Sequence, residues 1–234
     1  MRPDSILLFA ALLPAALLLR YIYRKDTIEK EPPMLLLRLF LFGVLACIPA
    51  ATLEQTFGRM LDNALPPDSL EYHLINAFAV VALIEEGLKF LFLKQLTWRS
   101  WDFNYRFDGI VYAVFISLGF AAFENIFYVY GYGLTAALPR MVLAVPAHMG
   151  FAVYMGAFYG QARLAAIRGK RAKSRRNLAA ALLVAVILHG FYDFCLFLNT
   201  SFTSLLFFLF VIIMYIVTVG FIRKQSREDS NFYL

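Results

Sequence analysis

Charged residues are scarce in this chain of 234 residues: only 16% are Asp, Glu, Lys or Arg, whereas 61% are hydrophobic. A soluble domain would carry about 25% charged residues. No long polar stretch is present from which tandem soluble domains could form, so they are not expected. The mean hydropathy of +0.67 instead indicates a polytopic membrane protein.

Cysteine is also rare, and the common short catalytic signatures are missing. The two cysteines, Cys47 and Cys195, lie in apolar runs, and no CxxC occurs, which argues against a disulfide framework or a redox pair. The zincin signature HExxH is absent. A Ser/His/Asp site is disfavoured because no GxSxG surrounds Ser117, the only serine inside the predicted spans that carry ionisable residues.

Seven hydrophobic segments are long enough to cross a bilayer, which takes about 20 residues of helix. We therefore expect an all-α fold, a polytopic membrane bundle of about seven transmembrane helices that forms one domain over residues 1–234. The predicted spans are 5–23, 34–53, 72–96, 107–130, 139–162, 178–198 and 202–222.

Lysine and arginine gather in alternate loops between these segments. With the N-terminus outside, 18 of the 22 basic residues fall inside, Arg2, Arg59 and Arg140 fall outside, and Lys89 lies within the membrane. The positive-inside rule then predicts N-terminus out and C-terminus in. The net charge of +6 therefore indicates topology, not nucleic-acid binding. The basic run at 168–176 fits a topology signal, with a lipid-headgroup contact as the alternative.

Seven ionisable side chains lie well inside four of the predicted spans, away from their ends, where a charged group costs roughly 2.5–3.5 kcal/mol on insertion scales and is a functional candidate. With a helical rise of ~1.5 Å per residue, five of them (Glu85, Glu124, His148, His189 and Asp193) fall near the midplane, within about two helical turns of one another. We therefore predict that these four helices turn them toward one site. The residues are Glu85, Glu86 and Lys89 in the third span, Glu124 in the fourth, His148 in the fifth, and His189 and Asp193 in the sixth.

Residue spacing refines this expectation. Glu85 and Lys89 are four residues apart, as are His189 and Asp193, so each pair shares a helix face. Glu86 points about 100° away from Glu85. Lys89 is therefore expected to neutralise one carboxylate while the other faces a different partner.

Two histidines and several carboxylates suit a catalytic zinc whose fourth position holds water, and a further carboxylate can take the proton from that water. A glutamate and a histidine could instead activate water without a metal. Two other classes stay open: a proton-coupled transporter or channel, and a non-catalytic scaffold or immunity-type membrane protein.

The ordered motifs EEGLK at 85–89, GFAAFENIFY at 119–128 and HGFYD at 189–193 resemble the PrsW family of intramembrane proteases. That family belongs to the wider group with the type II CAAX prenyl endopeptidases and the Abi membrane proteins. The stretches IEKEPPMLLLRLFLFG (28–43) and DGIVYA (108–113) are also similar, so the resemblance covers roughly 20–198. The second motif ends in Glu124 where the CAAX endopeptidases have histidine, which argues against prenyl-protein processing.

The resemblance implies a multi-pass protease of the bacterial plasma membrane with zinc as the expected metal. Its implied substrate is a single-span membrane protein, such as an anti-sigma factor cleaved at site one. The implied catalytic residues are Glu85, Glu86, Lys89 and Asp193. The implied metal residues are Glu124, His148 and His189.

Overall fold

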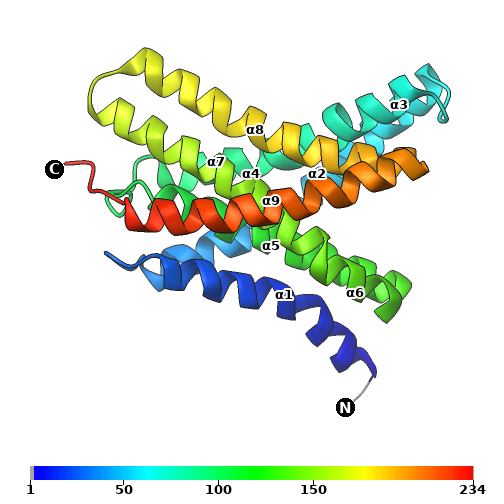
Figure 1. Cartoon of the computed structure of the whole chain (residues 1–234), viewed down its shortest axis with the longest axis horizontal. Coiled ribbons are helices and arrows are strands. Elements are labelled where there is room, and N and C mark those ends of the chain that lie inside the picture. The colour runs from blue at the N-terminus through cyan, green and yellow to red at the C-terminus, as the bar shows by residue number, and fades with distance from the viewer. Residues whose placement is uncertain (1–2, 234) are drawn as a thin grey trace.

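The computed structural model describes residues 3–233, which form a bundle of helices (Figure 1). Within that range the only β-type pairing is an isolated bridge between Tyr105 and Asn231, so the predicted all-α class is confirmed. The elements in chain order are α1 (Pro3–Lys25), α2 (Pro33–Ala64), α3 (Leu70–Ile75), the π-helix η1 (Asn76–Ala82), α4 (Leu83–Thr97), α5 (Asp108–Tyr132), α6 (Leu134–Val142), α7 (Ala144–Ile167), α8 (Arg171–Leu198) and α9 (Ser201–Arg227).

Six helical segments of the described chain are long and apolar enough to cross a membrane, which confirms the predicted class of polytopic membrane bundle. They match six of the seven predicted spans. The remaining span, 72–96, is divided among α3, η1 and α4, none of which is long enough alone. The backbone stays in the right-handed helical region through Asn76 and Leu83, so this segment is one continuous helical pass. The N-out orientation stays a prediction.

The largest difference from the predicted boundaries lies at the end of the second span. The second span was predicted to end at residue 53, but α2 continues to Ala64. Polar residues end the hydropathy signal there, yet they do not end the helix. The hydroxyl groups of Thr52 and Thr56 donate to the carbonyl oxygens of Ile48 and Thr52 within α2, so they are satisfied without breaking the helical ladder.

Glycine allows the closest helix crossings. A Cβ atom on Gly43 would lie 2.0 Å from the carbonyl oxygen of Ile116, and one on Gly156 would lie 2.4 Å from that of Gly109. The first contact joins α2 to α5 and the second joins α7 to α5, both backbone to backbone. Such small-residue packing is typical of membrane helices, and it fixes α5 at the centre of the bundle.

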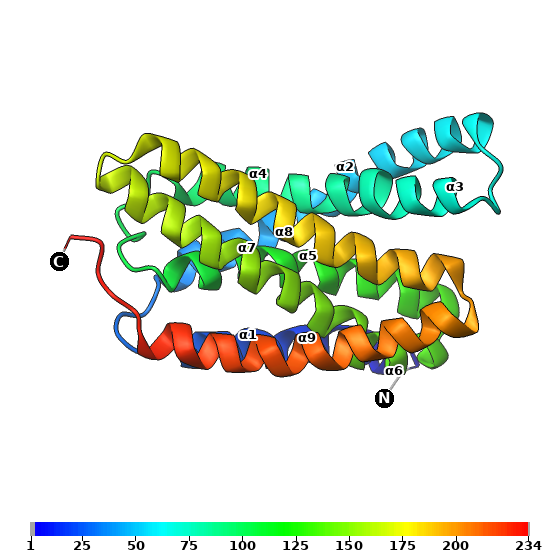
Figure 2. The ribbon, with the colours of Figure 1, turned by 45° about the horizontal axis from the view of Figure 1, so that its top comes forward.

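Aromatic rings fill the end of the bundle where α5 begins and α7 ends. Phe103 stacks on Tyr159 with ring centroids 5.1 Å apart and contacts Tyr112 and Phe232 edge-on. All four residues are buried. The C-terminus also lies at this end (Figure 2). Closely packed aromatic rings therefore fill this end, with the buried carboxyl groups of Glu31 and Asp108 beside them, and the side chains of the predicted site lie farther along α5 and α7.

Candidate active site

The acidic pair of α4 is held by the lysine one turn later. The Nζ atom of Lys89 lies 2.9 Å from Glu85 Oε2 and 2.8 Å from Glu86 Oε1. Lys89 is only 1% exposed, and both glutamates are buried. Both carboxylates share the ammonium group, whereas the sequence predicts that Lys89 serves only one; the different partner expected for the other carboxylate is present, since Glu86 also contacts His189. Two carboxylates and one ammonium leave a net negative charge, which favours a further cation beside them.

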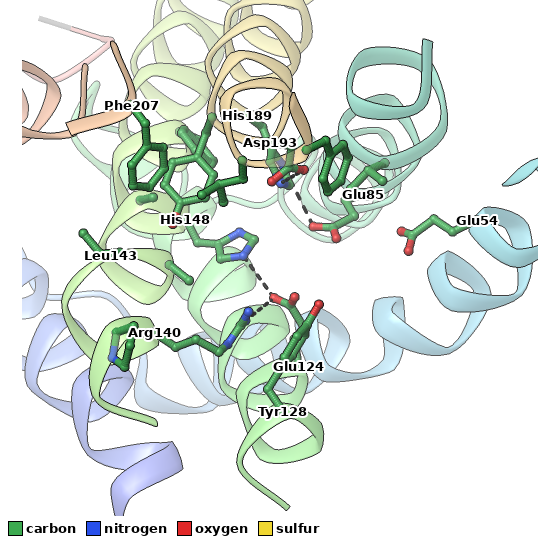
Figure 3. Close-up of a pocket in the computed structure, with 18 residues that line it drawn as sticks. Glu54, Glu85, Glu124, Tyr128, Arg140, Leu143, His148, His189, Asp193 and Phe207 are labelled. Carbon is green, nitrogen blue, oxygen red and sulfur yellow. Dashed lines mark hydrogen bonds and ion pairs between the residues drawn. The ribbon is translucent and has the colours of Figure 1, made fainter. Parts of the chain in front are cut away.

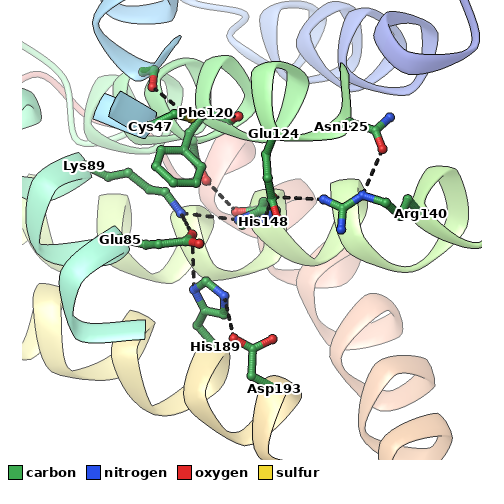
Figure 4. Close-up of polar contacts among 12 residues, drawn as sticks. Cys47, Glu85, Lys89, Phe120, Glu124, Asn125, Arg140, His148, His189 and Asp193 are labelled. Atoms are coloured by element: carbon green, nitrogen blue, oxygen red, sulfur yellow. Dashed lines mark hydrogen bonds and ion pairs between the residues drawn. The ribbon is translucent and has the colours of Figure 1, made fainter. Parts of the chain in front are cut away.

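His148 on α7 connects this group to α5. Its Nδ1 atom lies 3.3 Å from Lys89 Nζ, and its Nε2 atom lies 3.2 Å from Glu124 Oε2 (Figure 4). An ammonium group can only donate, so Nδ1 accepts from Lys89 and Nε2 carries the proton that it donates to Glu124. The imidazole ring is therefore fixed between a donor and an acceptor.

His189 on α8 meets the acidic pair from the other side. Its Nδ1 atom lies 2.9 Å from Glu86 Oε1, and its Nε2 atom lies 3.2 Å from Asp193 Oδ2. The ring stacks on Phe151 with centroids 5.0 Å apart. Asp193 thus orients the histidine, as a carboxylate partner commonly does for a metal-binding imidazole.

The π-helix η1 brings α4 close to α8. A Cβ atom on Gly190 would lie 2.4 Å from the ring of Phe78, a residue of η1. The glycine of the HGFYD motif therefore makes room for this ring and lets the two helices approach. Glu86 follows η1 closely, and His189 precedes Gly190, so the same approach brings these two side chains together. π-Helical segments frequently occur at functional sites.

The structure thus brings all seven predicted site residues into one network across α4, α5, α7 and α8. Their individual roles stay predictions. The network borders a cavity of about 410 Å³ (Figure 3). The polar residues that line it are Glu54, Glu85, Glu124, Tyr128, Arg140, His148, His189, Tyr192 and Asp193.

Arg140 belongs to this site, although its place in the sequence indicates only an outer basic residue. Its Nη2 atom forms an ion pair with Glu124 Oε2 at 2.9 Å, and its Nε atom donates to Asn125 Oδ1 at 3.0 Å. The guanidinium group also lies over the ring of Tyr128, 3.9 Å from its centroid. These contacts depend on how α6 folds back against α5, and no local sequence signal reveals that.

Glu54 is the second site residue that the sequence did not indicate. It lies on α2, one residue beyond the predicted end of the second span, and faces the cavity opposite Glu85 (Figure 3). Its Oε1 atom is buried and has no hydrogen-bond partner within the described residues. The other acids that line the cavity, Glu85, Glu124 and Asp193, each have a cationic or imidazole partner. Among these four cavity acids, only Glu54 has no such partner.

A divalent metal ion fits one part of the network. Glu85, Glu86, His148 and His189 each offer one ligand atom, and these atoms lie within 4.8 Å of one another. Imidazole nitrogens and carboxylate oxygens form a donor set suited to zinc. The buried Oε2 atom of Glu86 has no hydrogen-bond partner in the described chain, so it is free to bind an ion. Glu124 is not part of this group of four. It contacts Nε2 of His148, the ring nitrogen that faces away from Lys89.

Membrane-spanning helices around a buried cluster of acids and histidines define a polytopic membrane protein with a site of the metal-hydrolase type. The sequence model of the PrsW family intramembrane metalloproteases matches residues 31–220. The chain belongs to this family. No solved structure matches it.

Relatives match nearly the whole chain. A Protease PrsW of Shouchella clausii is 33% identical over 94% of this chain and 97% of that protein. Another, of Oceanobacillus iheyensis, is 35% identical over 96% of this chain and 97% of its own length. The Protease PrsW of Bacillus subtilis is 31% identical over 94% of both chains. The matches therefore cover nearly the full length of these relatives.

Proposed function

We propose that this chain is a membrane-embedded endopeptidase that hydrolyses a peptide bond of another membrane protein. The observation that carries the proposal is the meeting of Glu85, Glu86, His148 and His189 beside the cavity. Membership of the PrsW family, whose model describes intramembrane metalloproteases, supports it.

The two adjacent glutamates have different surroundings and therefore different proposed roles. Glu85 lines the cavity, whereas Glu86 does not and is 0% exposed. Glu85 is the base: one of its carboxylate oxygens takes the proton from the attacking water. Lys89 holds the same carboxylate in place through its Oε2 atom. Glu86 faces His189 and belongs to the ligand side of the site.

His148, His189 and Glu86 would hold the metal ion, zinc by their donor chemistry, with Nδ1 of His148 exchanging its contact with Lys89 for the ion. When bound, such an ion supplies a Lewis acid that polarises the scissile carbonyl group and activates water. The contacts favour this set over the predicted one that included Glu124, because Glu124 is already committed to Arg140 and to His148 Nε2. Glu124 and Asp193 then orient the two histidines.

Glu54 supplies the substrate contact on the opposite wall of the cavity. A peptide segment must leave the helical conformation to be cleaved, and its freed N–H groups find few acceptors inside a membrane. The unpartnered oxygen of Glu54 offers such an acceptor. It would hold the unwound segment against Glu85.

The substrate class is a single-span membrane protein, and we extend the proposal to site-one cleavage of an anti-sigma factor in the bacterial plasma membrane. The motif resemblance implies this role, and relatives from Bacillus and other bacteria agree with the location. The wider grouping with CAAX endopeptidases and Abi proteins rests on the motif resemblance alone.

The packing of the bundle supports hydrolysis over transport. An alternating-access path must open to both membrane faces in turn. Here the aromatic cluster around Phe103 and Tyr159 fills the end of the bundle where α5 begins. A cavity in the other half, closed at this end, suits a reaction chamber.

Co-expression with candidate single-span substrates tests the proposed function. The wild-type chain should release a clipped product that Glu85→Gln, Glu86→Gln and His189→Ala do not release. Glu71→Gln, which changes an exposed acid of α3, is the matched control and should cleave normally. Undiminished product from all three site variants would refute the protease assignment and favour a scaffold.

A further inference from the structure

A second polar hollow lies at the end of the bundle where α1 and α9 both finish. Its volume is about 670 Å³, and it is separate from the active-site cavity, with which it shares no lining residue. Four of its lining residues are cationic, two from each helix. The lining consists of Arg24 and Lys25 of α1, Thr27 and Ile28 of the following loop, and Arg223, Ser226 and Arg227 of α9.

These four cations have no anionic partner in the described part of the chain. The ammonium group of Lys25 has only a distant ring contact, 5.8 Å from the centroid of Tyr21. Two nearby acids are committed elsewhere: Glu29 accepts from the side chain of Asn104, and Asp229 accepts from the backbone of Phe107. Four unpaired positive charges repel one another, so an anion in the hollow would relieve that repulsion.

The position of the hollow identifies the source of the anion. The two candidate spans end at Lys25 and at Arg227, so the cations stand at the edge of the apolar region, where lipid headgroups lie. Exposed apolar side chains continue along both helices toward the bilayer centre, with Leu17 56% and Ile216 70% exposed. The site thus offers charge at headgroup depth and apolar surface below it.

We propose that this hollow binds the phosphodiester headgroup of an anionic phospholipid. Arginine binds phosphate oxygens through a planar fork of donors, and basic pockets between membrane helices bind anionic headgroups in this way. The direct link between the two helix ends is a hydrogen bond from Ser226 Oγ to the carbonyl oxygen of Lys25. A lipid bridging Arg24 and Arg223 would strengthen that link. A topology signal alone would not require cations from two distant segments to surround one hollow.

Native mass spectrometry of the purified full chain, titrated with phosphatidylglycerol or with phosphatidylcholine of the same acyl chains, tests this site. The variant carries Arg24→Gln, Lys25→Gln, Arg223→Gln and Arg227→Gln. A matched control carries Arg171→Gln, Lys173→Gln, Arg175→Gln and Arg176→Gln, which removes the same charge from exposed positions in and beside the first turn of α8. Inorganic phosphate at equal concentration separates a lipid from a free anion.

We expect wild type and control to retain phosphatidylglycerol over phosphatidylcholine, and the four-residue variant to bind it at least ~10-fold more weakly, since each basic residue near an anionic surface adds to the attraction. The smaller variant Arg24→Gln with Arg223→Gln, both exposed, should show part of the loss if the larger one does not fold. Equal retention by variant and wild type would overturn the proposal. Equal losses in variant and control, or competition by inorganic phosphate at the same concentration, would also overturn it.

Discussion

The Nζ atom of Lys89 on α4 lies 3.3 Å from Nδ1 of His148 on α7. The ammonium group that neutralises the acidic pair therefore also reaches the neighbouring helix. It makes three polar contacts, and it lies 4.0 Å from the ring centroid of Phe120 on α5. Lys89 is consequently the centre of the network, and its removal should affect the fold as well as the chemistry.

Replacing Lys89 by methionine should lower the free energy of unfolding by about 3–5 kcal/mol, because it leaves buried carboxylates without their partner. Chemical denaturation of the detergent-solubilised protein measures the change. Lys94→Met is the control, since Lys94 is an exposed lysine of the same helix. Similar losses in both variants would show that the buried ammonium group is not structurally important.

Substrate cleavage should require arginine at position 140, because the guanidinium group of Arg140 makes two polar contacts and lies over an aromatic ring. We expect both Arg140→Lys and Arg140→Gln to reduce substrate cleavage about tenfold, equivalent to ~1.4 kcal/mol of transition-state stabilisation. Arg59→Gln, which changes an exposed arginine of α2, should have no effect. Full rescue by lysine would mean that charge alone matters at this position.

Glu54→Met, which removes the acceptor, should leave the fold intact and raise KM more than it lowers kcat, because the proposed role of Glu54 is to hold the substrate segment. Loss of a hydrogen bond to a charged group costs roughly 1.5–3 kcal/mol, so kcat/KM should fall about 10–100-fold. Cleavage kinetics in detergent micelles give both constants. A change in kcat with KM unaltered would place Glu54 in the chemical step instead.

The loop between α1 and α2 should make stability depend on pH. Burial raises the pKa of the Glu31 carboxyl from 4.5 to about 7, although the Tyr112 hydroxyl group, which donates to Glu31 Oε2 at 2.6 Å, acts in the opposite direction. Burial likewise raises the pKa of Asp26 to about 6. Between pH 4.5 and about 7 the folded state therefore binds more protons than the unfolded state. The contribution of these two carboxyl groups to stability should be fully present below about pH 4 and should be lost as the pH rises through about 7.

Thermal unfolding between pH 4.5 and 8 measures this dependence for Glu31→Gln and for the wild type. The variant should show a flatter profile, with a difference of at most about 3 kcal/mol across the range. Glu29→Gln, an exposed acid of the same loop, is the control. A wild-type profile that rises with pH over this interval would contradict the assignment.

Membrane spans and the cost of burying charge were enough to predict the helices and the seven residues of the network. Glu85, Lys89, His189 and Asp193 are identifiable because an ionisable group inside an apolar helix is energetically costly and therefore indicates a functional site. Their similar depth along different helices then predicted that they meet. These signals are local, and a single sequence contains them.

The features that the sequence did not reveal depend on tertiary contacts. Glu54 was excluded by a hydropathy boundary, although α2 continues through it. Arg140 was treated as a loop cation, because its partner Glu124 lies on a different helix. The π-helix η1 has no distinctive composition, and its close approach to α8 at Gly190 appears only once the helices pack.

The central claim is that water, activated beside Glu85, cleaves a peptide bond in this cavity. Its most direct test is cleavage of a single-span substrate by the purified chain in proteoliposomes prepared in H2 18O, with mass spectrometry of the fragments. We predict that wild type places one 18O atom in the new carboxyl terminus and that Glu85→Gln yields no fragment. Product without 18O, or equal product from Glu85→Gln, would contradict the account.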